Sequence, residues 1–151
     1  HGGGKIGVMV RAESPAGATP EVLAAAKDCA LQVAAMNPPY LKREDVPAAV
    51  LDEEKKIILA QMAEDPKMAN KPEQVKEKIA AGKVGKYYGE NCLLEQAFVK
   101  ENKETVQSYV DGVAKAAGTT IAITDFVRFE RGEGIEKKAD NFAEEIASMI
   151  K

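Results

Sequence analysis

The sequence TTIAITDFVRFE, residues 119–130, contains the clearest strand signal in the chain. Most of its residues are β-branched or aromatic, and these types are enriched in strands. Apolar side chains recur at every second position, with Asp125 as the exception. This period of two predicts a strand with one buried face. The residues predicted on that face are Ile121, Ile123, Val127 and Phe129.

A second strand is predicted over residues 5–12, where Ile6, Val8 and Val10 share one face. A helix should run from Pro20 to about Met36, because Thr19 offers an N-cap directly before the proline. Its predicted core stripe consists of Val22, Ala26, Cys29, Ala30, Val33 and Met36. Further helical patterns cover 47–62, 71–84 and 104–117. Strands near both ends with helices between them predict an α+β fold.

The helices predicted between residues 45 and 90 have thin apolar stripes and many charged residues. We expect them to form an antiparallel hairpin that projects as an arm and packs mainly on itself. We treat residues 1–151 as a single domain, with this hairpin as an insertion over 45–90 and a C-terminal helix module over 136–151. The last helix should place Phe142 and Ile146 on one side.

Composition argues against several classes of partner. The 21 basic residues nearly balance the 24 acidic ones, so a net charge of −3 provides no general attraction for nucleic acid. No apolar run approaches the ~20 residues that a membrane span needs. Cys29 and Cys92 are isolated, which favours a reducing compartment. We therefore expect a soluble chain, with a start that has been cut, that binds neither nucleic acid nor membrane directly.

No catalytic constellation is visible in the sequence. The only histidine is His1, which argues against a histidine-based triad and a multi-histidine metal site. The glycines at positions 2–4 precede a strand, whereas a phosphate-binding loop follows one. We predict that the chain is not an enzyme and that it needs no cofactor and no metal.

Phe98 and Val99 lie in a segment with no regular apolar period, between Gln96 and Lys100. Such a segment is either a loop folded onto the core or an exposed anchor for a partner protein. The residues alone leave both interpretations open.

Several motifs, taken in order, resemble the C-terminal half of elongation factor Ts. They are HGGGKIGV at 1–8, AAMNPPY at 34–40, KP at 71–72, EQAFV at 95–99 and RFERGEGIEK at 128–137. Together they span essentially the whole chain. The resemblance implies a small three-stranded antiparallel sheet packed against helices, with an inserted helical hairpin and a C-terminal helix.

The resemblance also implies a function. Elongation factor Ts is a guanine nucleotide exchange factor that binds nucleotide-free elongation factor Tu, so that GDP leaves and GTP enters. The residues that match its partner-binding positions are His1, Gly2, Phe98, Val99 and Lys100. The closing helix is expected to contact the nucleotide domain of the GTPase. Family members work in the bacterial cytoplasm, the plastid stroma or the mitochondrial matrix.

Three departures from the family pattern shape this hypothesis. The N-terminal helical domain and the first core subdomain have no counterpart here. The letters TDFV at 124–127 match an exchange motif of that subdomain, but they align with the final strand and carry no exchange role. Ala97 stands where the family commonly has proline, which leaves the local turn less rigid.

Two hypotheses follow from this resemblance. In the first, the chain docks on elongation factor Tu but promotes exchange poorly by itself. In the alternative, it is a structural module that forms a homodimer and has little direct contact with the GTPase.

Overall fold

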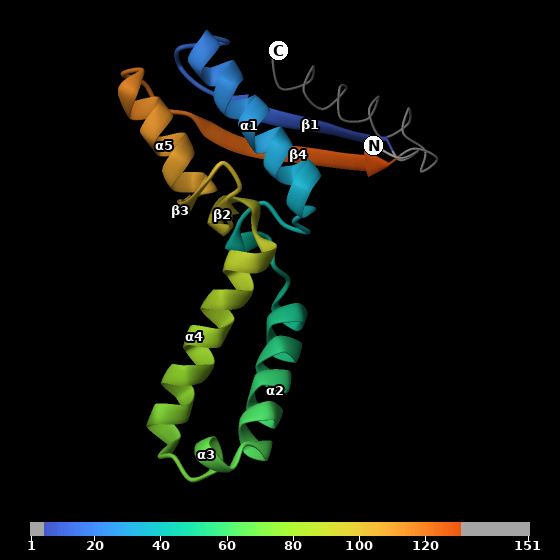
Figure 1. Ribbon diagram of the computed structural model, residues 1–151, viewed down its shortest axis with the longest axis vertical. Coiled ribbons are helices and arrows are strands. Elements are labelled where there is room, and N and C mark those ends of the chain that lie inside the picture. Colours follow the sequence, from blue (N-terminus) through green and yellow to red (C-terminus); the bar gives the residue numbers. More distant parts are fainter. Residues whose placement is uncertain (1–4, 131–151) are drawn as a thin grey trace.

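Two antiparallel strands form the longest sheet in the structure. The computed structural model describes residues 5–130, in which β1 (Ile6–Glu13) pairs with β4 (Ala122–Glu130). The two strands predicted near the ends of the chain are therefore confirmed. Figure 1 shows them side by side, with helices on one side and a long helical arm projecting away from them.

The pairing of β1 with β4 contains a β-bulge between Arg11 and Ala12. Arg11 lies opposite Asp125 and Ala12 opposite Ile123, so Thr124 is the extra residue. After one extra residue in a strand, each later residue lies on the opposite face from the one that unbroken alternation predicts.

Because of the bulge, the prediction that the four alternating apolar residues of this part of the chain share one buried face is partly wrong. Ile121 and Ile123 are buried in the core as predicted, but beyond the bulge Phe126 packs against that core. Phe129 instead lies against Gly7, on the opposite face of the sheet. The single row of four residues is thus divided between two faces.

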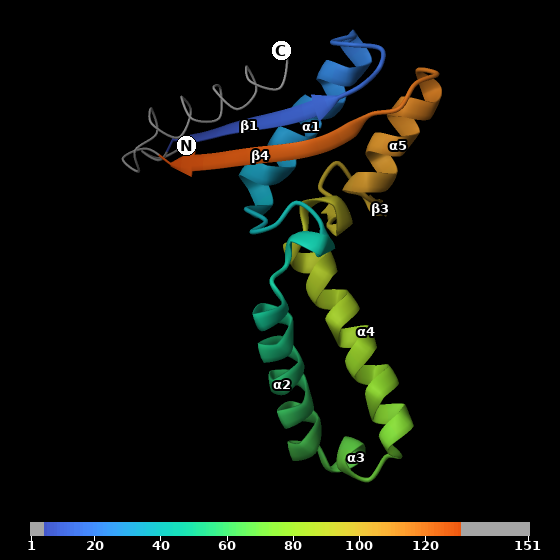
Figure 2. The ribbon, with the colours of Figure 1, turned by 180° about the vertical axis from the view of Figure 1, so that it is seen from behind.

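Helix α1 (Pro20–Met36) confirms the first predicted helix. The hydroxyl of Thr19 accepts a hydrogen bond from the Val22 N–H at 3.3 Å, which satisfies one of the free donors of the first turn. The helix ends at Asn37, whose φ of 45° is left-handed. Figures 1 and 2 show α1 lying along the β1–β4 sheet.

The core of the body lies between α1, the sheet and α5 (Val106–Ala116). Its buried members are Val22, Ala25, Cys29, Val33, Leu93, Phe98, Val106, Val110, Ala114, Ile121 and Ile123. The predicted stripe of α1 is partly wrong, because Met36 is 52% exposed. One of the fully buried residues near that end of the helix, Gln32, is polar.

The arm consists of α2 (Ala48–Glu64), the short α3 (Pro66–Ala69) and α4 (Glu73–Asn91). Figures 1 and 2 show α2 and α4 side by side, with α3 at the far end. Ile58, Met62 and Val84 form a buried cluster separate from the core of the body. The arm therefore packs on itself, as its thin apolar stripes predicted.

Short elements join the arm to the body: η1 (Arg43–Asp45), η2 (Leu93–Glu95), β2 (Ala97–Phe98) and β3 (Glu101–Thr105). Strands β2 and β3 pair only with each other. Residues 5–130 thus form two sheets of two strands instead of the expected sheet of three. The reason is length, because β2 has two residues and α5 begins directly after β3. The α+β class is confirmed.

The C-terminal helix module expected over 136–151 lies outside the described residues. Between residues 5 and 130, no helix is both long and apolar enough to cross a membrane.

Candidate partner-binding site

The turn between β2 and β3 carries three of the residues expected to bind a partner. Phe98 ends β2, and Val99 and Lys100 form the turn before β3. Val99 is 45% exposed, whereas Phe98 is only 3% exposed. The other two expected residues, His1 and Gly2, lie outside the described part of the chain.

The ring of Phe98 belongs to the core of the body. It stacks on the ring of Tyr109 of α5, with 4.2 Å between ring centroids and 19° between the ring planes. The position of Phe98 therefore agrees with the first interpretation of this segment, a loop folded onto the core. The apolar side chain that the turn exposes is Val99.

A buried amide of α1 holds the backbone of the turn. The Gln32 Oε1 accepts a hydrogen bond from the Val99 N–H at 2.8 Å. The Gln32 Nε2 donates to the Ala97 carbonyl and to the Gln96 Oε1, each at 3.1 Å. These bonds fasten the chain on both sides of Phe98.

An acidic residue one helical turn earlier holds the side chains of the same region. The Asp28 carboxylate accepts hydrogen bonds from the Tyr109 hydroxyl and, at 2.9 Å, from the Lys100 ammonium. Burial alone would raise the pKa of Asp28, but these two donors outweigh it and the pKa lies below its usual value. Burial and the bond to Asp28 raise the pKa of the Tyr109 phenol.

Sequence reasoning missed Asp28, Gln32 and Tyr109 as supports of this site. A signal was present, because Asp28 and Gln32 are polar residues four apart in an otherwise Ala-rich helix, and this spacing places both on one face. The sequence does not reveal that this face lies against residues 97–100.

The arrangement is suited to binding. The polar groups around the turn are engaged with one another, and the groups it exposes are an aliphatic side chain and an ammonium. Within residues 5–130, His, Cys, Asp and Glu side chains form no group of three or more that could hold a metal ion.

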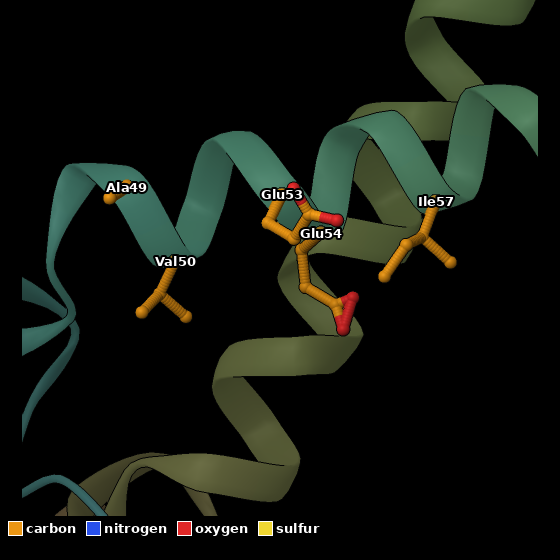
Figure 3. Close-up of a pocket in the computed structure, with 5 residues that line it drawn as sticks. All are labelled: Ala49, Val50, Glu53, Glu54 and Ile57. Atoms are coloured by element: carbon orange, nitrogen blue, oxygen red, sulfur yellow. The ribbon is translucent and has the colours of Figure 1, made fainter.

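A hollow on the arm lies along α2 (Figure 3). It has a volume of about 310 Å³ and is lined by Ala49, Val50, Glu53, Glu54 and Ile57. Its two carboxylates would repel a phosphate, and its other three lining side chains are aliphatic. We therefore assign no ligand to this hollow.

Comparison with known proteins gives a consistent result. A family model described as elongation factor TS matches residues 1–133. Elongation factor Ts of Clostridium kluyveri is 47% identical over 151 residues, which cover 99% of this chain and 47% of that protein. The factor of Syntrophotalea carbinolica is 44% identical over 151 residues, covering 100% of this chain and 48% of its own length.

The chain spans about half the length of the curated relatives that it matches. The matched region contains β1, α1, the whole arm, the β2–β3 turn and β4. On this evidence, the chain belongs to the elongation factor Ts family.

Proposed function

We propose that this chain docks onto elongation factor Tu through the turn of Val99 and Lys100, and that it thereby contributes to the release of GDP. Family membership is the observation that carries the proposal, because the matched region includes this turn. Since the relatives are bacterial proteins, we place the function in the bacterial cytoplasm.

The construction of the turn supports a docking role. Hydrogen bonds with Gln32 hold its backbone, and Asp28 accepts a hydrogen bond from the Lys100 ammonium. A contact that is already ordered before binding loses less conformational entropy when the partner arrives. Because Asp28 neutralises Lys100, we expect the turn to contribute shape and an apolar contact more than net charge.

Release of GDP requires the chain to prefer the nucleotide-free GTPase. By linkage, GDP must then weaken the binding of the chain by the same factor, at about 1.4 kcal/mol for each tenfold change. This reciprocal effect separates an exchange factor from a protein that merely adheres to the GTPase.

Titration calorimetry of the chain into nucleotide-free elongation factor Tu, with and without GDP, tests the proposal. We expect binding without nucleotide and weaker binding with GDP. Addition of the chain should also accelerate the release of a fluorescent GDP analogue, though less than a full-length factor does. Absence of binding in both titrations would overturn the proposal, and equal affinities would remove the exchange role.

A variant at Val99 tests the place of contact. Phe98 is a poor probe because its truncation would damage the core. Val99→Ser leaves the core intact and should weaken binding by about tenfold, as loss of an apolar anchor does. The matched control is Leu23→Ser, which alters an exposed aliphatic residue near the far end of α1.

A further inference from the structure

We propose that Gln32 is a positioning residue that sets the direction in which the Val99–Lys100 turn faces elongation factor Tu. This inference rests on the proposed function. Gln32 itself is fully buried and touches no partner, so it acts through the backbone of the turn.

Gln32 uses both ends of its amide on this turn. Its Oε1 accepts from the Val99 N–H at 2.8 Å, and its Nε2 donates to the Ala97 carbonyl at 3.1 Å. The two bonded groups lie on either side of Phe98. Gln32 therefore fixes the chain direction entering and leaving the residue that anchors the turn in the core.

The β2–β3 ladder offers little alternative support. Strand β2 has two residues, and its register with β3 is irregular between Ala97 and Phe98. A turn on such a short ladder depends on other partners for its backbone groups. Gln32 supplies a partner for one backbone donor, the Val99 N–H, and for one backbone acceptor, the Ala97 carbonyl.

The amide of Gln32 is itself held in place by a second buried amide. Its Nε2 also donates to the Gln96 Oε1 at 3.1 Å, and the Gln96 Nε2 donates to the Glu90 carbonyl of α4 at 3.0 Å. Both glutamines are buried, and a buried amide costs stability unless it is hydrogen-bonded. This chain of bonds joins α1, the end of α4 and the turn, and it leaves Gln32 a single orientation.

An apolar residue of similar size would fill the space of Gln32 without holding the turn. In Gln32→Leu, the Val99 N–H and the Ala97 carbonyl lose their partners, so the turn must move to reach water. Val99 would then no longer point in one fixed direction. Binding should weaken although the contacting side chains are unchanged.

The experiment compares the affinities of Gln32→Leu and the original chain for nucleotide-free elongation factor Tu, at a temperature where both are folded. We expect a loss of about tenfold in affinity. Hydrogen exchange should be faster at the Val99 amide and unchanged at the amides that pair β1 with β4. The control is Val22→Ala, which truncates a core residue of α1 ten positions from Gln32.

A double-mutant cycle with Val99→Ser separates positioning from general destabilisation. If Gln32 acts through Val99, Gln32→Leu should cost much less affinity when Val99→Ser is already present. An equal loss in both backgrounds, or an affinity of Gln32→Leu within twofold of the original, would overturn the inference. If Gln32→Leu fails to fold, Gln32→Asn takes its place, because its shorter amide does not reach the turn.

The affinity of the unsubstituted chain distinguishes failure of the positioning role from failure of the proposed function. If it binds and Gln32→Leu binds equally well, the positioning role is wrong and the proposed function stands. If the original chain does not bind, both are wrong.

Discussion

The ring of Phe129 in β4 lies directly on Gly7 of β1, so closely that a Cβ at position 7 would overlap it. The two residues are paired in the register of the sheet, and the missing side chain of Gly7 provides the space for the ring. An aromatic ring over a strand glycine covers backbone that the glycine would leave open.

Substitution of Gly7 should therefore destabilise the body. We expect Gly7→Ala to lower the free energy of unfolding by about 2 kcal/mol, because the added methyl group displaces the Phe129 ring. Chemical denaturation measures this change. Gly112→Ala in α5 is the matched control, since its Cβ would meet no atom within 4 Å and alanine favours a helix. A neutral Gly7→Ala would show that the ring has free space to move into.

The Asp28 carboxylate should make stability depend on acid pH. Its folded-state pKa lies below the reference value of 3.8, so its ionised form stabilises the fold above that pH. That contribution is lost as the pH falls through the folded-state pKa. Unfolding measured between pH 2 and 6 should show a smaller loss for Asp28→Asn than for the original chain. Asp52→Asn, exposed on the arm, is the control. Parallel curves for the original chain and Asp28→Asn would contradict this prediction.

Both cysteines should resist thiol reagents while the chain is folded. Burial, with a smaller effect of Asp28, raises the pKa of Cys29 to about 12. Burial, followed by the charge of Glu95, raises the pKa of Cys92 to about 11. Because the thiolate is the reactive form, we expect modification at pH 8 only after denaturant is added. Cys29→Ala and Cys92→Ala each leave one thiol to follow. A thiol that reacts in native buffer at the rate of a free cysteine would contradict its burial.

Arg43 should stabilise the base of the arm by a small amount. Its Nε and Nη2 donate to the two carboxylate oxygens of Glu95 at 2.8 and 2.6 Å, and its guanidinium lies 4.4 Å from the Tyr88 ring centroid. The Arg43 side chain is 52% exposed, so solvent screens the pair. A double-mutant cycle of Arg43→Ala and Glu95→Ala should give a coupling of about 0.5 kcal/mol that falls at high salt. A coupling of zero at low salt would show that the pair leaves stability unchanged.

Local signals in the sequence were sufficient for the ends of α1 and for the main strands, but not for the end of α4, which continues to Asn91 past the predicted end at residue 84. Thr19 and Pro20 mark the start of α1, and Asn37 followed by Pro38 marks its end, because capping groups act within a few residues of where they stand. The alternation of Ile6, Val8 and Val10 likewise placed β1 correctly. The thin apolar stripes of the arm helices also predicted an arm that packs mainly on itself.

Features that depend on distant partners could not be predicted in the same way. Gln32 finds its partners 64 to 67 residues further along the chain, and no local pattern shows that a glutamine will be buried there. Phe98 was ambiguous for the same reason, since Tyr109 decides its burial. Apolar periodicity assumes an unbroken ladder, so it also missed the bulge at Thr124.

The bulge changes the alternation of β4 in the way that an inserted base shifts a reading frame. Thr124 is the extra residue, so its removal alone would place Asp125 directly after Ile123 and leave every later residue opposite its present partner in β1. Phe126 would still pack against the core, and Phe129 would still cover Gly7. Removal of Val127 in the present register would instead invert the residues that follow it and move the Phe129 ring away from Gly7. A deletion at Val127 should therefore be far more damaging than the deletion of Thr124.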